Sequence, residues 1–353
     1  MSSASAAGSI MAFARSGGRN AGMYVDTVTV ALVLAITLLG LIMVTSASIS
    51  IADQSTGEEL LFLKRQFVLA VAGAAAATLV FFTPTALLER LSVPLLVTAM
   101  LLLVAVLIPG LGHEVNGARR WLRIGGVSFQ VSELARMLVL IYLASYAVRR
   151  EEELRTTFVG LAKPLGLLVC AAALLLAEPD FGAAIVLFST GFGLLFLAGA
   201  RLRYVIGVTM AAVVAFAVLA VTSPYRKRRL LAFLKPWDDP YDSGFQLTQS
   251  LIAIGRGEWF GVGLGESVQK LFYLPEAHTD FLFAVLAEEL GLVGVVVTLA
   301  LFLALVWRSL WIARMASDAG LRFQACLAAG FGLWLGLQAF INIGVNMGVL
   351  PTK

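Results

Sequence analysis

Apolar residues along this chain fall into long uninterrupted runs and do not alternate with polar ones. Nine such runs reach or exceed the roughly 18 residues that a helix needs to cross a bilayer. In lipid each segment must satisfy its own backbone hydrogen bonds, and the period-two pattern of a membrane barrel is missing. We therefore predict an all-α polytopic membrane protein without paired strands. The expected spans are residues 25–48, 66–83, 91–109, 131–148, 158–177, 181–199, 203–222, 281–307 and 323–346.

The composition fits this class, because 59% of the 353 residues are hydrophobic and 14% are charged. Residues 1–24 are rich in Ser, Ala and Gly, so we expect a flexible cytoplasmic tail. The apolar run from Val25 to Ala47 is too long for a cleaved signal peptide and should remain as the first helix. Residues 25–353 are expected to form a single helical transmembrane domain that includes a large outer loop, residues 223–280.

Basic residues set the expected orientation. With the N-terminus inside, the inner connections carry far more Lys and Arg than the short outer ones, as the positive-inside rule requires. The long loop is given little weight, because such loops cross the membrane largely regardless of charge. This orientation puts Asp280 on the outer face, where a reaction needs a substrate that arrives already activated. The inner residues are Arg15, Arg19, Arg90, Arg149, Arg150, Arg155, Lys163, Arg201, Arg203, Arg308, Arg314 and Arg322, and the outer ones are Lys64, Arg65, Arg119, Arg120 and Arg123.

The loop 223–280 is too rich in apolar and aromatic residues to be a disordered linker. Phe245–Ile254 is predicted to form a short helix at the membrane interface, followed by a turn with several glycines, residues 255–265. The basic run Tyr225–Arg229 either anchors the loop to anionic headgroups or captures an anionic lipid substrate. Loops of this length are often functional.

Common catalytic signatures are missing from the sequence. No P-loop, GxGxxG, HExxH, CxxC or GxSxG motif occurs. Cys170 and Cys326 both lie inside apolar runs, where a thiol behaves as a small hydrophobe, so neither a disulfide nor a metal pair is expected. No nucleic-acid partner is expected either. Carboxylates and basic side chains near the helix ends remain as the candidates for chemistry.

Asp280 is the foremost candidate, because it stands where the apolar run beginning at Phe281 enters water. It has two interpretations. As an N-cap it would stabilise that helix, and the helix dipole would then favour its charged form. As a general base it would need partial desolvation or a nearby substrate proton. His278, two residues earlier, has three possible roles, which are to tune Asp280, to touch substrate or to pack at the interface.

A second cluster lies between residues 116 and 136. Glu133 and Arg136 are three residues apart, so on a helix they share a face and can pair. Such a pair lowers the cost of charge near the membrane. Alternatively, Arg120, Arg123 and Arg136 present forked donors to phosphate oxygens at the outer surface.

The segment Glu178–Gly182 separates two apolar runs and predicts a tight outer hairpin. Asp180 is expected to cap the helix that follows, with Pro179 just before it, and Ser132 is expected to cap the fourth span. Structural roles are favoured for all three.

Polar residues also occur inside the last two apolar runs. At 1.5 Å per residue, Glu288 and Glu289 lie about 12 to 14 Å along the helix from Asp280. At 100° per residue they cannot both line one cavity with it, so we expect at least one to face a polar cavity or an arginine. In the last run, polar residues recur every fourth position, at Gln338, Asn342 and Asn346. Their side chains form either hydrogen bonds between helices or the wall of a hydrophilic groove.

Five motifs follow one another from the second outer loop to the end of the chain. They are Asn116-Gly117-Ala118 with Arg120-Trp121, Phe129-Gln130 with Ser132–Arg136, Glu178–Gly182, Leu274–Phe281, and Gln338 through Asn342 to Pro351. In this order they resemble the SEDS family of cell-wall glycosyltransferases, and the run Glu276–Asp280 and the ending Leu350–Lys353 resemble its cell-division branch. Val131 departs from the resemblance, since proline often stands there in the family.

The resemblance implies a peptidoglycan glycosyltransferase that polymerises lipid II on the outer face of the cytoplasmic membrane at the division septum. Its implied partners are a class B penicillin-binding transpeptidase and other divisome membrane proteins. Asp280 matches the family's essential aspartate, Glu133 and Arg136 match a functional acid and base pair, and Arg120 matches an arginine of the second outer loop. The family has ten helices, with a Gly-rich outer segment and a tenth helix after the position of Lys353, whereas about nine spans are expected in this chain.

This chemistry needs one base and several cations. A sugar hydroxyl attacks an anomeric carbon whose leaving group is a lipid diphosphate, which departs as a stabilised anion and needs no proton donor. Asp280 would deprotonate the hydroxyl, while Arg120, Arg136 and Lys270 would hold the diphosphate. A divalent cation, Mg²⁺ or Mn²⁺, would bridge phosphate oxygens and an acid. The alternatives are a lipid II flippase, for which no pair of broken helices is evident, and a scaffold for the transpeptidase.

Overall fold

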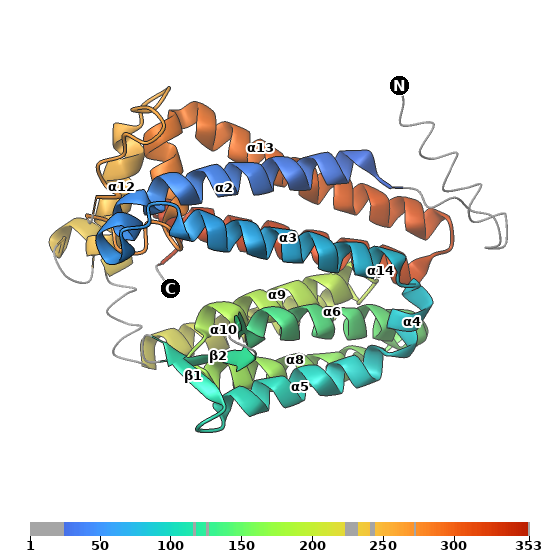
Figure 1. Cartoon of the computed structure of the whole chain (residues 1–353). Coiled ribbons are helices and arrows are strands. Elements are labelled where there is room, and N and C mark those ends of the chain that lie inside the picture. The colour runs from blue at the N-terminus through green and yellow to red at the C-terminus, as the bar shows by residue number, and fades with distance from the viewer. Residues whose placement is uncertain are drawn as a thin grey trace. The chain divides into compact units, whose positions relative to one another are not determined.

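The computed structural model describes residues 25–115, 118–124, 127–222, 232–240, 244–271 and 273–351, which are mainly helical with one small sheet (Figure 1). Two compact units are present, and each is treated by itself. Unit 1 comprises Met1–Asp26, Thr83–Met210 and Val306–Leu337. Unit 2 comprises Thr27–Phe82, Ala211–Leu305 and Gln338–Lys353.

The helices follow the predicted spans closely. Among the described residues, seven helices are long and apolar enough to cross a membrane, while α5 and α9 are apolar but have 16 and 17 residues. The chain is therefore a polytopic membrane protein. The helices are α2 (Thr27–Thr56), α3 (Leu61–Phe82), α4 (Thr85–Arg90), α5 (Ser92–Leu107), α6 (Val131–Arg149), α7 (Glu151–Thr156), α8 (Phe158–Ala177), α9 (Phe181–Leu197), α10 (Leu202–Thr222), η1 (Pro236–Asp238), α12 (Phe245–Arg256), α13 (Leu282–Asp318) and α14 (Arg322–Asn346).

Apolar side chains of α3 are exposed to the surroundings. None of its residues is buried, and Leu79 and Phe82 are 72% and 64% exposed. A soluble protein rarely tolerates such a continuous apolar surface, whereas lipid tails cover it without cost. This surface is the direct structural correlate of the long apolar runs.

Unit 1 contains a small sheet that the sequence analysis did not predict. Strands β1 (Gly112–Val115), β2 (Ala118–Ile124) and β3 (Val127–Gln130) form an antiparallel sheet in the order β1-β2-β3. The expectation of no paired strands was wrong here, because the lipid argument applies only to spanning segments. Trp121, Ile124, Val127 and Phe129 are β-formers on either side of a Gly-Gly dipeptide, which is a hairpin signal.

Helix α13 in unit 2 is broken at Gly291, so the predicted span 281–307 is not one continuous helix. Gly291 has φ 63° and ψ −162°, in a region that only glycine adopts readily. The backbone groups freed by the break pair with the turn that follows α12. The pairs are Val262 N–H to Glu288 C=O, Gly263 N–H to Glu289 C=O, Leu292 N–H to Glu258 C=O, and Val293 N–H to Trp259 C=O.

Glycines allow this turn to approach the break closely. A Cβ at Gly291 would lie 2.3 Å from the Gly261 nitrogen, and one at Gly261 would lie 2.1 Å from the Glu289 carbonyl oxygen. Helix α12 and the glycine-containing turn after it were both predicted from sequence, and α12 is confirmed. The long loop is therefore fixed, through its backbone, to α13, which begins two residues after Asp280.

Candidate functional site

The Asp280 carboxylate is exposed and uncommitted. It immediately precedes the buried Phe281, which packs with Met43 and Ala47 of α2 and with Ala284. Within the described part of the chain, no hydrogen bond reaches the Asp280 side chain, so it does not cap α13. The capping interpretation is thereby set aside, and the carboxylate stays available to a ligand.

The cap of α13 comes instead from α14. The Asn346 Oδ1 accepts a hydrogen bond from Ala284 N–H at 3.1 Å, and its Nδ2 donates to the Asp280 carbonyl at 2.9 Å. Asn346 is fully buried, and Asn342 Nδ2 lies 3.5 Å from the same carbonyl. The polar stripe on α14 therefore serves hydrogen bonding between segments, the plainer of its two predicted roles.

His278 lies beside α3. Its ring meets the Phe62 ring edge-on, with centroids 4.9 Å apart. The Nδ1 atom is buried without a hydrogen-bond partner among the described residues. His278 therefore packs against α3, in agreement with the packing role considered above. A polar ligand atom that reached Nδ1 would give this atom a hydrogen-bond partner.

Lys270 belongs to a buried ion pair. Its Nζ donates to Glu289 Oε1 at 2.7 Å, to the Gly265 carbonyl at 2.6 Å and to Ser46 Oγ at 3.0 Å. The Ser46 hydroxyl in turn contacts both Glu289 carboxylate oxygens at 2.7 Å. An ammonium has three donors, and these three acceptors use them all. Lys270 in this arrangement holds protein groups and has no donor left for a diphosphate.

Glu288 holds the neighbouring segment. Its fully buried carboxylate accepts hydrogen bonds from the Ser267 hydroxyl, from Val268 N–H at 3.2 Å and from Arg256 NH1 at 3.2 Å. The expectation that at least one of the two buried acids meets an arginine is confirmed. Sequence reasoning missed Ser46 and Ser267, because serines in apolar surroundings carry no signal of their partners.

In unit 1, Arg120 joins the sheet to the turn between α8 and α9. Its Nε donates to the Glu178 carbonyl at 3.3 Å, its NH2 donates to the Pro179 carbonyl at 2.5 Å, and Nε lies 3.9 Å from Asp180 Oδ2. The side chain is 33% exposed. It therefore keeps a solvent-accessible cationic face that an anion can reach.

Glu133 and Arg136 pair as their spacing predicted. Arg136 NH2 donates to Glu133 Oε1, and its guanidinium lies 5.7 Å from the ring centroid of Trp334. Arg136 is buried, while 42% of the Glu133 side chain is exposed. The predicted cap at Ser132 was wrong, since α6 begins one residue earlier and the Ser132 hydroxyl has no partner among the described residues.

Asp180 caps α9 as predicted, through a hydrogen bond of 3.0 Å from Ala183 N–H to Oδ1. Its Oδ2 accepts from Gln130 Nε2 at 3.2 Å. Glu178, two residues earlier, is fully buried, and neither carboxylate oxygen has a partner within the described residues. Burial first, and then the Asp180 charge, raise the pKa of Glu178 to about 8 against the partial opposition of Arg120.

Replacing Glu178 by glutamine is expected to stabilise the protein increasingly as pH rises. The folded state keeps the Glu178 proton up to a pKa of about 8, whereas the unfolded chain releases it near 4.5. The wild type therefore loses stability between these values, while the neutral amide does not. After allowance for solvent screening, the gain should reach roughly 2 kcal/mol above pH 8 and vanish below pH 4.5.

Thermal unfolding in detergent at pH 5, 7 and 9 measures this effect. Glu58→Gln is the matched control, because the Glu58 side chain is 57% exposed. A stability difference between Glu178→Gln and wild type that stayed constant from pH 5 to 9 would contradict a buried neutral acid.

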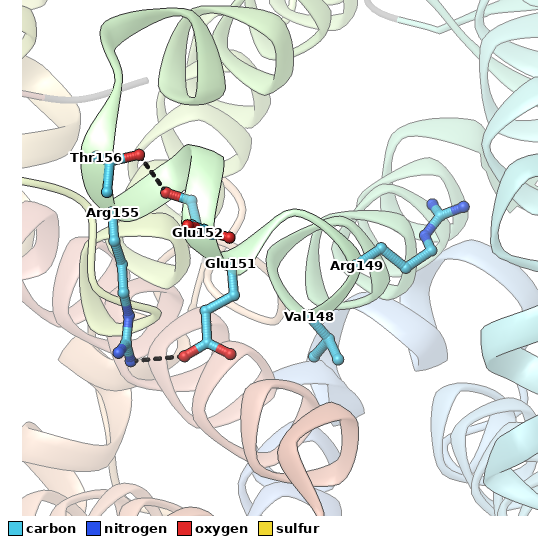
Figure 2. Close-up of a pocket in the computed structure, with 6 residues that line it drawn as sticks. All are labelled: Val148, Arg149, Glu151, Glu152, Arg155 and Thr156. Atoms are coloured by element: carbon cyan, nitrogen blue, oxygen red, sulfur yellow. Dashed lines mark hydrogen bonds and ion pairs between the residues drawn. The ribbon is translucent and has the colours of Figure 1, made fainter.

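An open surface pocket of about 390 Å³ lies at the other end of α6, in the α6–α7 corner (Figure 2). Charged residues line it, and two of them pair with each other. Arg155 contacts Glu151 at 3.0 Å, and the Thr156 hydroxyl donates to the Glu152 carbonyl at 2.6 Å. The sequence singled out no candidate here, and the pocket is about 24 Å along α6 from Glu133.

Two parts of the predicted chemistry lie outside the described residues. These are the dipeptide Asn116-Gly117 and the basic run Tyr225–Arg229. Within the described residues, no group of three or more His, Cys, Asp or Glu side chains could hold a metal ion.

Comparison with known proteins gives concordant relatives. The probable peptidoglycan glycosyltransferase FtsW of Thioalkalivibrio sulfidiphilus is 57% identical over 321 residues, covering 91% of this chain and 80% of the relative. The corresponding protein of Nitrosococcus halophilus is 54% identical over 321 residues, covering 90% and 83%.

Solved structures agree. One described as a peptidoglycan synthase complex that coordinates polymerization and crosslinking matches with a TM-score of 0.74 and 32% identity, covering 93% of this chain and 88% of that one. The rod shape determining protein RodA of Thermus thermophilus matches with a TM-score of 0.63 and 29% identity, covering 90% and 83%. The sequence pattern of the FTSW/RODA/SPOVE family, described as cell cycle proteins, matches residues 26–353. This chain belongs to that family.

Proposed function

We propose that this protein is a peptidoglycan glycosyltransferase that polymerises lipid II during cell division. The observation that carries the proposal is the Asp280 carboxylate, exposed and free of capping bonds while its backbone is fixed by Asn346. Two relatives that are more than 50% identical to this chain are named probable peptidoglycan glycosyltransferase. Asp280 itself belongs to one of the five motifs that resemble the SEDS family, Leu274–Phe281.

Asp280 would act as the general base. An exposed carboxylate has free lone pairs to accept the proton of the acceptor sugar hydroxyl as the new glycosidic bond forms. The attack would invert the donor carbon and release polyprenyl diphosphate. Neither Glu288 nor Glu289 can share this role, because each is buried and bonded to protein groups.

Arg120 and Arg136 would bind the diphosphate. Both guanidinium groups are fixed by protein acceptors, which lowers the entropy lost when they orient on phosphate oxygens. Glu133 would hold Arg136 in place. Lys270 is left out of this role, since its ammonium is fully engaged. A bound Mg²⁺ or Mn²⁺ would neutralise phosphate charge, with the exposed carboxylate of Glu133 or Asp280 as a protein ligand.

The setting of the reaction follows from the chemistry. Lipid II carries its own leaving group, so the reaction can proceed at the outer face without ATP. We place the N-terminus in the cytoplasm and the protein at the septum of the cytoplasmic membrane. A class B penicillin-binding transpeptidase is the proposed partner, and other divisome membrane proteins are expected beside it. A structural relative described as coordinating polymerization and crosslinking supports this pairing.

A lipid II flippase is the second candidate, and the break in α13 is the observation in its favour. Transporters use broken helices, whose free carbonyls and amides bind substrate or ions. Here the groups freed at Gly291 are paired with the segment Glu258–Gly263. They are therefore unavailable for coordination, and the transferase is preferred.

Purified protein in lipid nanodiscs, mixed with labelled lipid II with and without the transpeptidase, separates the candidates. Polymer resolved by gel as a ladder identifies the transferase. Movement of lipid II between leaflets in vesicles, without polymer, identifies the flippase. Absence of both activities, with the transpeptidase still bound, identifies a scaffold and would end the proposal.

A further inference from the structure

A buried asparagine at the end of α14 connects three segments of unit 2. Asn346 has no exposed surface. Its Nδ2 donates to the carbonyls of Asp280 and Asn342, both at 2.9 Å, and its Oδ1 accepts from Ala284 N–H. Its own carbonyl accepts from the Ser250 hydroxyl of α12 at 2.8 Å.

Two of these bonds act at the candidate base and just after it, at the Asp280 carbonyl and at Ala284 N–H. The first helical turn of α13 leaves amide groups without intrahelical partners, and a residue just before the helix usually supplies the acceptor. Here Asn346 helps to supply it to Ala284, which also contacts the Phe281 carbonyl at 3.0 Å. The second bond holds the Asp280 carbonyl, so the backbone from Asp280 to Ala284 is held at both ends by α14.

We infer that Asn346 is a positioning residue that replaces Asp280 as the cap of α13 and holds the Asp280 backbone, leaving the carboxylate free to act. The inference rests on the proposed function only for its catalytic consequence. An Asp280 that capped its own helix would direct its carboxylate at backbone amides, which would stabilise its anion and weaken it as a base. Asn346 removes this competition.

Three variants distinguish a role of Asn346 in placing Asp280 from a role in the stability of the fold alone. Asn346→Asp keeps an oxygen that can accept from Ala284 but has no amide to donate to Asp280. Asn346→Ala removes both bonds. Ser250→Ala is the matched control, because it deletes a buried hydrogen bond of the same junction without touching the Asp280 backbone.

The test measures kcat and KM for lipid II polymerisation in nanodiscs. Both Asn346 variants should lower kcat about 10- to 100-fold, because a shift of the Asp280 carboxylate by about 1 Å moves it out of line with the reacting hydroxyl. The KM should stay within about threefold of the wild-type value. Ser250→Ala should retain at least about half of the wild-type kcat. A wild-type kcat in Asn346→Asp, or an equal loss in Ser250→Ala, would overturn the inference.

Hydrogen exchange provides a readout that does not depend on activity. Peptides covering residues 277–286 should exchange faster in Asn346→Ala than in wild type or in Ser250→Ala, because Ala284 N–H loses its cap. Unchanged exchange in Asn346→Ala would refute the local contact whatever the enzyme assay shows. A wild-type protein that makes no polymer would instead count against the proposed function, and the exchange result would still decide the contact.

Discussion

Replacement of Asp280 by asparagine should reduce lipid II polymerisation by about 100- to 10,000-fold, the usual contribution of a general base. Asparagine has nearly the same shape but cannot accept the hydroxyl proton. Because no described residue bonds to the Asp280 side chain, the substitution removes no structural contact, and the thermal stability should not change. The rate of polymer formation from labelled lipid II, measured at equal protein concentration in nanodiscs, provides the test.

Asp238→Asn is the matched control for this experiment. Asp238 belongs to the same long loop, is exposed and pairs only loosely with Lys235 at 3.5 Å. Its replacement should leave the polymerisation rate within about twofold of wild type. If Asp280→Asn polymerised lipid II at the wild-type rate while folding normally, Asp280 would not be the base.

Replacement of Lys270 by methionine should give the largest loss of stability, about 3 to 5 kcal/mol in the free energy of unfolding. Glu289 would then be left as a buried carboxylate without its cation, and burial of an unpaired charge is far more costly than loss of a surface pair. Thermal unfolding or denaturant titration in detergent measures the change.

A second substitution identifies the cause. In the double variant Lys270→Met with Glu289→Leu, the unpaired charge is gone, so much of the lost stability should return. Lys64→Met is the control, because the Lys64 and Glu58 side chains are 65% and 57% exposed and such pairs contribute little. A Lys270→Met variant as stable as Lys64→Met would show that the buried pair is not what holds the 265–270 segment to α2 and α13.

The sequence by itself determined the class of this protein and the position of its helices. Each predicted span coincides with an apolar helix, and in the described part of the chain only the one at 281–307 is interrupted, by the break at Gly291. The reason is that a continuous apolar run can satisfy its backbone in lipid only as a helix. Local spacing also predicted the Glu133–Arg136 pair, the Asp180 cap and the helix at Phe245, since each depends on residues a few positions apart.

Only the tertiary structure decided which polar groups are free and which are engaged. From the sequence, Asp280 could be either a cap or a base, and Lys270 was proposed as a ligand for diphosphate. In the fold, Asn346, 66 residues later, helps to cap α13 and leaves Asp280 open, while Ser46 and Glu289 occupy Lys270. Spacing along a helix cannot reveal partners that come from other helices. The free energy of a buried polar group depends on those partners, and they exist only once the chain has folded.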